Sequence, residues 1–265
     1  MYAMSGMGGM TEVGYGWLTP ILSYCMAVLG SALGLRCTVR AVAATGTARR
    51  NWLLTAASAI GSGIWTMHFI AMLGFGVTGT EIRYNVPLTV LSLFGAVFFV
   101  GLGVFTVGYS GHRVRALLIG GLTTGFGVAA MHYMGMAALQ LHGGLSYDPS
   151  MVALSVVIAV VAATAALWAG LNVKGPVAAA GAALVMGFAV SSMHYTGMAA
   201  VHVAVHPAAT PLSGASLMQF VFPLAVGLGS YLFLTTAFVA LSPTAQERAD
   251  AAVAERLRHA QPAAH

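Results

Sequence analysis

Charged side chains are scarce in this chain: Asp, Glu, Lys and Arg together make up only 6% of its 265 residues. Soluble domains carry roughly 25% charged residues, so this scarcity excludes an ordinary soluble domain. Hydrophobic residues instead make up 58% of the sequence, and the mean hydropathy is +0.86. The sequence pI is near 9.5, but the basic residues are too few and too scattered to form a nucleic-acid-binding surface.

Cysteine is almost absent as well. The two cysteines, Cys25 and Cys37, stand 12 residues apart in one apolar stretch, which is roughly 18 Å along a straight helix. That separation is too large for a disulfide bond, so we interpret both as small packing residues. Phosphate-binding loops, nucleophile elbows and paired catalytic carboxylates are also missing from the sequence, and no motif points to an enzymatic substrate.

The chain is rich in long apolar runs. Each run has the roughly 18 or more residues needed to cross a hydrocarbon core about 30 Å thick. They predict an all-α integral membrane protein with seven transmembrane helices. The expected spans are about residues 18–39, 52–76, 87–108, 116–141, 151–171, 176–203 and 215–241.

Basic residues are distributed unevenly across the predicted membrane. Of the eleven Lys and Arg residues, all but Arg83 fall on one side, and Arg83 lies beside Glu81. Because basic residues collect on the cytoplasmic side, we expect the N-terminus outside and the C-terminus in the cytoplasm. Residues 242–265 then form a short cytoplasmic tail. Residues 1–17 form an extracytoplasmic leader rich in Met and Gly, which we expect to be unstructured rather than a metal-capture arm, and which lacks the basic start of a signal peptide.

An internal repeat organises residues 18–241. The stretches are "GSGIWTMHFIAM" at 61–72, "GFGVAAMHYMGM" at 125–136 and "GFAVSSMHYTGM" at 187–198. In each, a glycine precedes a Met-His pair, and a second Met follows the His by four residues. This pattern predicts three two-helix repeats, at about 18–76, 87–141 and 151–203, followed by a seventh helix at 215–241. The second, fourth and sixth helices are then related by pseudo-threefold symmetry.

The three repeated histidines are predicted to share one depth. His68, His132 and His194 lie 16 to 18 residues after the starts of their helices, a rise of about 24 to 27 Å. This places them near the outer surface. Small residues three positions after each His let helices approach closely, so we expect the three rings to meet on a common axis. In a single copy, a packed histidine among gap-filling methionines is the simpler interpretation. Three matched copies of a polar group within the membrane favour a site.

The side chains at this depth indicate a soft metal ion. Thioethers favour Cu(I), imidazole binds copper in either oxidation state, and the carboxylates that Mg²⁺ and Ca²⁺ prefer are missing. Copper is therefore the expected metal. The candidate ligands are His68, His132, His194, Met72, Met136, Met198, Met67, Met131 and Met193. Tyr133, Tyr195 and Met134 are candidates for supporting those ligands or joining them. His142, His202 and His206, at the outer ends of the helices, are either loop histidines or a metal-access site.

These repeats resemble the MHYT family of bacterial membrane sensors, named for the tetrad found here at 193–196. The resemblance covers six of the seven predicted helices. It implies a seven-helix domain of the bacterial inner membrane in which Met, His and Tyr bind copper and sense a diatomic gas such as O₂, CO or NO. In this sequence that role falls on Met67, His68, Met72, Met131, His132, Tyr133, Met136, Met193, His194, Tyr195 and Met198.

Two features depart from the family pattern. Phe69 stands where the other two copies have Tyr, so a role shared by three tyrosines is not expected. Many members of the family continue into cyclic-dinucleotide synthase or hydrolase domains after the last helix, whereas this sequence stops at His265. We therefore expect any signal to pass to a separate cytoplasmic protein.

Four functions remain compatible with the sequence. The first is a copper-dependent sensor of a diatomic gas or of redox or copper status. The second is a copper-handling or copper-transporting protein, which would need ligands at successive depths. The third is a haem protein with two of the histidines as axial ligands, and the fourth is a membrane copper oxidoreductase. A single layer of repeated ligands favours the sensor.

Overall fold

The computed structural model describes residues 10–12, 16–206, 210–242 and 253. In these residues seven helices are long and apolar enough to cross a membrane, as the sequence predicts. The helices are α1 (Leu18–Val42), α2 (Gly46–Met72), α3 (Val86–Tyr109), α4 (Arg113–Ala137), α5 (Pro149–Asn172), α6 (Pro176–Ala199) and α7 (Phe222–Leu241), the last preceded by a single π-helical turn, Leu217–Val221.

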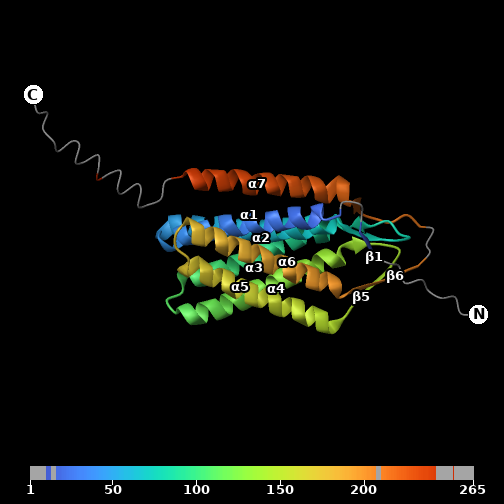
Figure 1. Ribbon diagram of the computed structural model, residues 1–265, viewed down its shortest axis with the longest axis horizontal. Helices are drawn as coiled ribbons and strands as arrows, with labels where there is room; N and C mark the ends of the chain where they lie inside the picture. Colours follow the sequence, from blue (N-terminus) through green and yellow to red (C-terminus); the bar gives the residue numbers. More distant parts are fainter. Residues whose placement is uncertain (1–9, 13–15, 207–209, 243–252, 254–265) are drawn as a thin grey trace, which may run out of the picture.

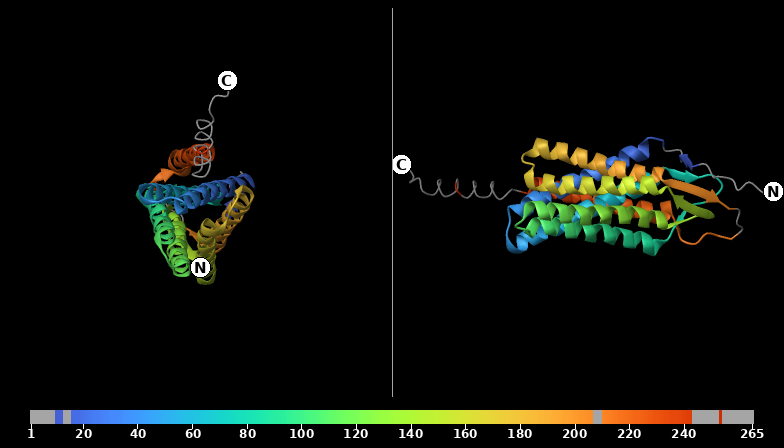
Figure 2. Two further views of the ribbon diagram at one scale, coloured as in Figure 1. Left: turned by 90° about the vertical axis from the view of Figure 1, so that its left-hand side faces the viewer. Right: turned by 90° about the horizontal axis from the view of Figure 1, so that it is seen from below.

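The first six helices form a three-sided bundle. Viewed along its axis, the hairpins α1–α2, α3–α4 and α5–α6 make the three sides of a triangle (Figure 2). Each hairpin also packs on the next, through α2 with α3, α4 with α5 and α6 with α1. Helix α7 lies outside the triangle along α1 and α2 (Figures 1 and 2). Three hairpins plus a seventh helix is the arrangement that the repeat predicts.

The first glycine of each repeat brings neighbouring hairpins into close contact. A Cβ added at Gly61 or Gly125 would lie 2.7 Å or 2.5 Å from the Cα of the valine that faces it. Because a methyl group does not fit against backbone at these distances, only glycine allows the helices to pack so closely. The three contacts are equivalent by the pseudo-symmetry: Gly61 with Val97, Gly125 with Val160, and Gly187 with Val28.

We call the end of the bundle nearest the repeated histidines the histidine end. Two of the helices that start at this end, α3 and α5, begin with a polar cap. The Asn85 side chain accepts a hydrogen bond from the Leu88 amide at 3.0 Å and starts α3. The Asp148 carboxylate accepts from the amides of Ser150 and Met151 and starts α5. A hydrogen bond from the Ser150 hydroxyl, followed by these two amides, lowers the pKa of the Asp148 carboxyl group. These caps satisfy amides that have no partner in the first helical turn.

Short strands close the histidine end of the bundle (Figure 1). Helices α2, α4 and α6 end four residues earlier than their apolar runs, which reach residues 76, 141 and 203. Part of each run-on segment forms a strand instead of helix. The spans were predicted too long because apolar content alone does not distinguish a helix from a strand. The antiparallel pairs are β1 (Met10–Glu12) with β2 (Phe75–Val77), β3 (Arg83–Tyr84) with β4 (Leu139–Gln140) and with β7 (Ala215–Ser216), and β5 (Gly143–Tyr147) with β6 (Val201–Val205).

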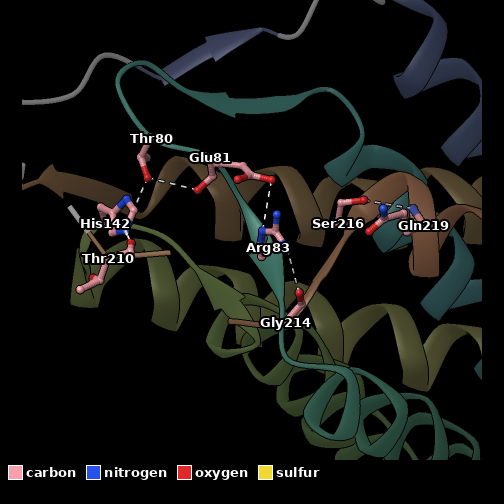
Figure 3. Close-up of polar contacts among 8 residues, drawn as sticks. All are labelled: Thr80, Glu81, Arg83, His142, Thr210, Gly214, Ser216 and Gln219. Atoms are coloured by element: carbon pink, nitrogen blue, oxygen red, sulfur yellow. Dashed lines mark hydrogen bonds and ion pairs between the residues drawn. The ribbon is translucent and has the colours of Figure 1, made fainter. Parts of the chain in front are cut away.

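Polar contacts tie these strands and their loops together (Figure 3). The Arg83 guanidinium forms an ion pair with Glu81 at 3.2 Å and donates to the Gly214 carbonyl at 3.3 Å. A ring nitrogen of His142 lies 2.8 Å from the Thr210 carbonyl oxygen. These contacts link the segments that follow α2, α4 and α6.

The expected leader is partly ordered. Its residues 10–12 form β1 and pair with β2, although the leader was predicted to be unstructured. The strand forms because β2 offers it an open edge to pair with. Residues 1–9 and 13–15 of the leader lie outside the described residues, as does the expected tail from 243 on, except for residue 253.

The opposite end of the bundle, which we call the basic end, holds the last turn of α7. The Arg40 guanidinium of α1 donates to the backbone carbonyls of Val239 and Ser242 at 2.8 Å and 2.7 Å. It also lies 5.1 Å from the ring centre of Trp52 on α2. A cation that satisfies free carbonyls at a helix C-terminus stabilises that end. Arg40 therefore fixes α7 to the first hairpin.

The close glycine contact yields a first prediction. Gly125→Ala places a methyl group 2.5 Å from Val160 Cα, so the helices must separate, and overpacking of this kind costs roughly 1–3 kcal/mol. We expect the variant in detergent to unfold at a lower temperature than the wild type. Gly181→Ala is the matched control, because a Cβ there meets no atom within 4 Å. Equal losses in both variants would contradict the packing role of Gly125.

Candidate metal centre

The three repeated histidines meet at one point. The Nδ1 atoms of His68, His132 and His194 lie 3.0, 3.2 and 3.3 Å from one another. They come from α2, α4 and α6, one from each side of the triangle. Each residue is at most 1% exposed. The structure thus forms a buried triangle of ring nitrogens, which we call the histidine triangle.

The residue after each histidine packs edge-on against its ring. The ring centres of His68 and Phe69 are 4.7 Å apart, and the corresponding distances are 4.8 Å at His132 with Tyr133 and 5.0 Å at His194 with Tyr195. Edge-to-face contact of this type fixes the plane of a ring. Since a phenylalanine ring does this as well as a tyrosine ring, Phe69 is compatible with the symmetry.

The second glycine of the repeat packs against the Nε2 side of a histidine ring from another helix. A Cβ at Gly135 would lie 2.5 Å from His68 Nε2, and a Cβ at Gly197 would lie 2.5 Å from His132 Nε2. Neither Nε2 atom has a hydrogen-bond partner among the described residues. Each imidazole is therefore held between the triangle and the backbone of the next helix.

The triangle has the dimensions of a metal site. Three nitrogens bound at about 2.0 Å to a tetrahedral ion are roughly 3.3 Å apart, close to the separations found here. Hydrogen bonds among the three rings also favour a metal site over a packed cluster. Three converging nitrogens cannot all donate to one another, and lone pairs that face each other in an apolar interior repel. A bound cation removes that repulsion.

The methionines that flank the histidines in the sequence differ in burial. All three methionines that precede the histidines, Met67, Met131 and Met193, are at most 1% exposed. A second methionine follows each histidine by four residues. Of these, Met72 and Met136 are equally buried, whereas Met198 is half-buried. All six pack in the hydrophobic cluster of the histidine end. Met134 is half-buried.

The two tyrosines have different surroundings. The Tyr133 hydroxyl lies 2.7 Å from the Ser155 hydroxyl of α5, so its partner is a neighbouring helix. Tyr195 is 41% exposed and borders a cavity together with His194. Both tyrosines support a histidine ring through the edge-on contacts described above.

The histidines expected beyond the helices lie among the strands and loops. His142 is engaged on both sides, because its amide donates to Thr80 and its ring contacts the Thr210 carbonyl (Figure 3). His202 is exposed on β6 with its Nδ1 3.3 Å from the Ala200 carbonyl oxygen. The His206 amide donates to the His142 carbonyl at 3.0 Å. Among the His, Cys, Asp and Glu side chains of the described residues, the group of mutually close ligand atoms consists of the three histidines of the spans.

Three buried serines of the bundle were not anticipated. Each lies on an odd-numbered helix, is fully buried, and donates to a carbonyl three residues earlier. Two of them also serve the even helices, since Ser92 accepts from the Trp65 indole at 2.9 Å and Ser155 meets Tyr133. The signal was present as a repeated Leu-Ser pair, with exposed Leu and buried Ser: Leu22-Ser23, Leu91-Ser92 and Leu154-Ser155.

The hydroxyl pair at α4 and α5 gives a second prediction. A buried hydrogen bond contributes roughly 1 kcal/mol, so Tyr133→Phe and Ser155→Ala should each lower the free energy of unfolding in detergent. The double variant should lose less than the sum of the two, because both single changes remove the same bond. Additive losses in this double-mutant cycle would contradict the contact. Ser150→Ala with Tyr133→Phe is the control pair, since Ser150 bonds to Asp148 instead.

Comparisons with known proteins identify the repeat. The family model described as a bacterial signalling protein N terminal repeat, MHYT, matches residues 61–121 and 125–183. No solved structure shows a significant match.

Several known proteins resemble the chain over most of its length. The bifunctional diguanylate cyclase/cyclic di-GMP phosphodiesterase MucR of Pseudomonas aeruginosa is 41% identical over 191 residues, which is 70% of this chain and 28% of MucR. The cyclic di-GMP phosphodiesterase NbdA of the same organism is 40% identical over 62% of this chain and 21% of NbdA. The signaling protein YkoW of Bacillus subtilis is 29% identical over 68% of this chain and 23% of YkoW.

The chain thus spans less than a third of the length of these relatives. The two matched repeats contain the Met-His motif of the first two copies, all of α5 and the first part of α6. With the seven membrane-spanning helices, these matches show that the chain belongs to the MHYT family of multi-pass proteins of the bacterial inner membrane.

Proposed function

We propose that this chain is a membrane sensor that binds copper at the histidine triangle and responds to O₂, CO or NO, or to redox or copper status. The observation that carries the proposal is the convergence of three buried imidazoles, with six methionines in the surrounding cluster. Imidazole and thioether donors without carboxylates suit copper. Bound there with an open position, copper would supply affinity for a diatomic gas.

Signalling is supported by the relatives. MucR and NbdA are named for cyclic di-GMP synthesis or breakdown, and the matched portion is a minor part of each. By analogy with these relatives, we infer that the membrane bundle signals to a cytoplasmic partner.

The distribution of charge supports an orientation with the histidine end outside. In the described part of the chain the acidic residues Glu12, Glu81 and Asp148 all belong to strands and loops of that end, whereas Lys and Arg, apart from Arg83, gather at the basic end. Basic residues favour the cytoplasmic side. Helix α7, which Arg40 joins to the first hairpin at the basic end, is then placed to pass a movement of α1 and α2 to the cytoplasm.

Copper transport is the second candidate, supported by two small internal cavities. They measure about 40 Å³ and 30 Å³, lie between the helices, and share Met186 and Thr124 in their walls. Met186 is a thioether seven residues before Met193 on the same helix, so the repeated ligands are not the only soft donors along the bundle. Met193 also lines the larger cavity, and the walls are otherwise apolar or hydroxyl-bearing. A conduit needs ligands at successive depths, and a fixed site fits better.

The other two alternatives have less support. A haem held by two histidines needs space for the porphyrin between the ring nitrogens, and the nitrogens here are within 3.3 Å of one another. An oxidoreductase would use the same ligands, and turnover of an organic substrate with O₂ would identify it.

A third prediction tests the metal. Protein purified without chelators should contain copper by elemental analysis, and its absorption spectrum should change with CO or NO. His132→Ala should lose the copper and still assemble, since it removes one of three ligands and leaves the backbone contact of Gly125 with Val160 intact. Gly135→Leu should lose copper and also disturb packing, because its side chain meets His68.

His142→Ala is the matched control, since this histidine bonds to loop residues and its loss should leave the copper content unchanged. Wild-type protein without copper, or His132→Ala protein with its full copper content, would refute the site.

A fourth prediction tests the orientation. In a Cys25→Ser background, Gly144→Cys on β5 and Lys174→Cys between α5 and α6 place single exposed thiols at the two ends. A membrane-impermeant thiol reagent added to intact cells should label the first and not the second. The reverse pattern would place the histidine end in the cytoplasm. Labelling of both variants after lysis is the control for accessibility.

A further inference from the structure

The pseudo-threefold symmetry of the histidine triangle is broken at one corner. His68 rests on Gly135 and His132 rests on Gly197, each the residue three positions after the next histidine. The residue that completes this cycle for His194 is Ala71 on α2. An alanine carries the methyl group for which the other two corners have no space, so the third ring cannot seat against its neighbouring helix in the same way.

A cavity lies at this corner. Its volume is about 290 Å³, and both His194 and Ala71 form part of its wall, whereas His68 and His132 do not. Helices α1, α2 and α6 enclose it, and its wall includes the exposed residues Gly16, Tyr195 and Ala199. Since Gly16 precedes α1 and Ala199 ends α6, the cavity opens at the histidine end of the bundle.

Soft donors stand along this opening. Met72 of α2 and Met198 of α6 both line the cavity with His194. Met198 is half-buried, while the equivalent Met136 is fully buried. A thioether that is partly exposed beside a buried imidazole offers successive ligands to a soft cation that moves inward.

We propose that this cavity is the port through which a soft monovalent cation, and any small uncharged ligand of the site, reaches the histidine triangle. The other two corners are closed by the backbone of Gly135 and Gly197 against the rings. The port differs from the access route that the sequence suggested, since none of His142, His202 and His206 lines it. This inference rests on the proposed function for the identity of the cation and on the cavity alone for the route.

The route can be tested without metal. Diethyl pyrocarbonate, a small uncharged reagent that acylates neutral imidazole, is added to metal-free protein in lipid nanodiscs, and modification is followed at each histidine by peptide mass spectrometry. His194 should be acylated faster than His68 and His132, because it alone of the three meets the cavity. Equal rates at the three residues, including no reaction at any of them, would overturn the port.

A matched pair of variants locates the route. Ala199→Phe places a ring at the rim and should slow acylation of His194 about tenfold, since access then needs a rare opening. Ala137→Phe is the control, because Ala137 occupies the same position after His132, is also exposed, and does not line the cavity. The exposed His202 is an internal standard for reagent activity. Unchanged acylation of His194 in Ala199→Phe would contradict the proposal.

Loading with Cu(I) adds the second readout. Ala199→Phe should take up copper about tenfold more slowly than wild type and Ala137→Phe, and reach the same final content, because the ligands are intact. If the wild-type protein takes up no copper, the proposed function fails while the acylation rates still decide the port. If copper loads equally fast in all three proteins, the port fails and the metal site stands.

Discussion

The meeting of three imidazole nitrogens inside an apolar bundle is the constraint on which the other features depend. To bring Nδ1 atoms within 3.3 Å, three helices must approach more closely than ordinary side chains allow. The glycines of the repeat make this possible at two levels, Gly125 against Val160 and Gly135 against the His68 ring. The aromatic residue after each histidine then fixes the plane of its ring. The odd helices contribute buried serines near the same level.

The repeat separates what is symmetric from what is not. The histidines, their edge-on aromatic neighbours, the contacts of the first glycine of each repeat and the Leu-Ser pairs all occur three times. The exceptions gather around the first hairpin: Ala71 replaces glycine, Phe69 replaces tyrosine, and α7 packs on α1 and α2. Three identical corners would give the site no distinct opening. Since these departures lie at the first hairpin, the proposed port and the packing of α7 both involve that hairpin.

The sequence was sufficient for the features that follow from length and period. Seven apolar runs predict seven spans, and a spacing of about 63 residues puts His68, His132 and His194 at one depth, because equal rise along parallel helices gives equal depth. The strands were missed because "VHVAV" at 201–205 is as apolar as the helix before it, and its pairing with β5 is a contact between distant segments. The Leu-Ser pairs were overlooked since a single serine in a span barely changes its hydropathy. Which ring rests on which helix could not be read from spacing either, because that assignment depends on the direction in which the hairpins follow one another around the axis. The structure supplies this cyclic order. It pairs Ala71 with His194, and this corner of the triangle borders the cavity.

The balance of protons bears on the copper site that we propose. If all three rings carry their proton on Nε2, three lone pairs converge at Nδ1 and repel in a medium of low polarity. If one ring carries it on Nδ1, that single proton is shared between two acceptors, and the Nε2 atoms of His68 and His132 still lack a partner among the described residues. An unsatisfied buried polar group costs about 1–3 kcal/mol. A soft cation that accepts all three lone pairs relieves the repulsion completely, and a proton relieves it only in part. At the copper site that we propose, metal and proton would therefore compete for the same three nitrogens.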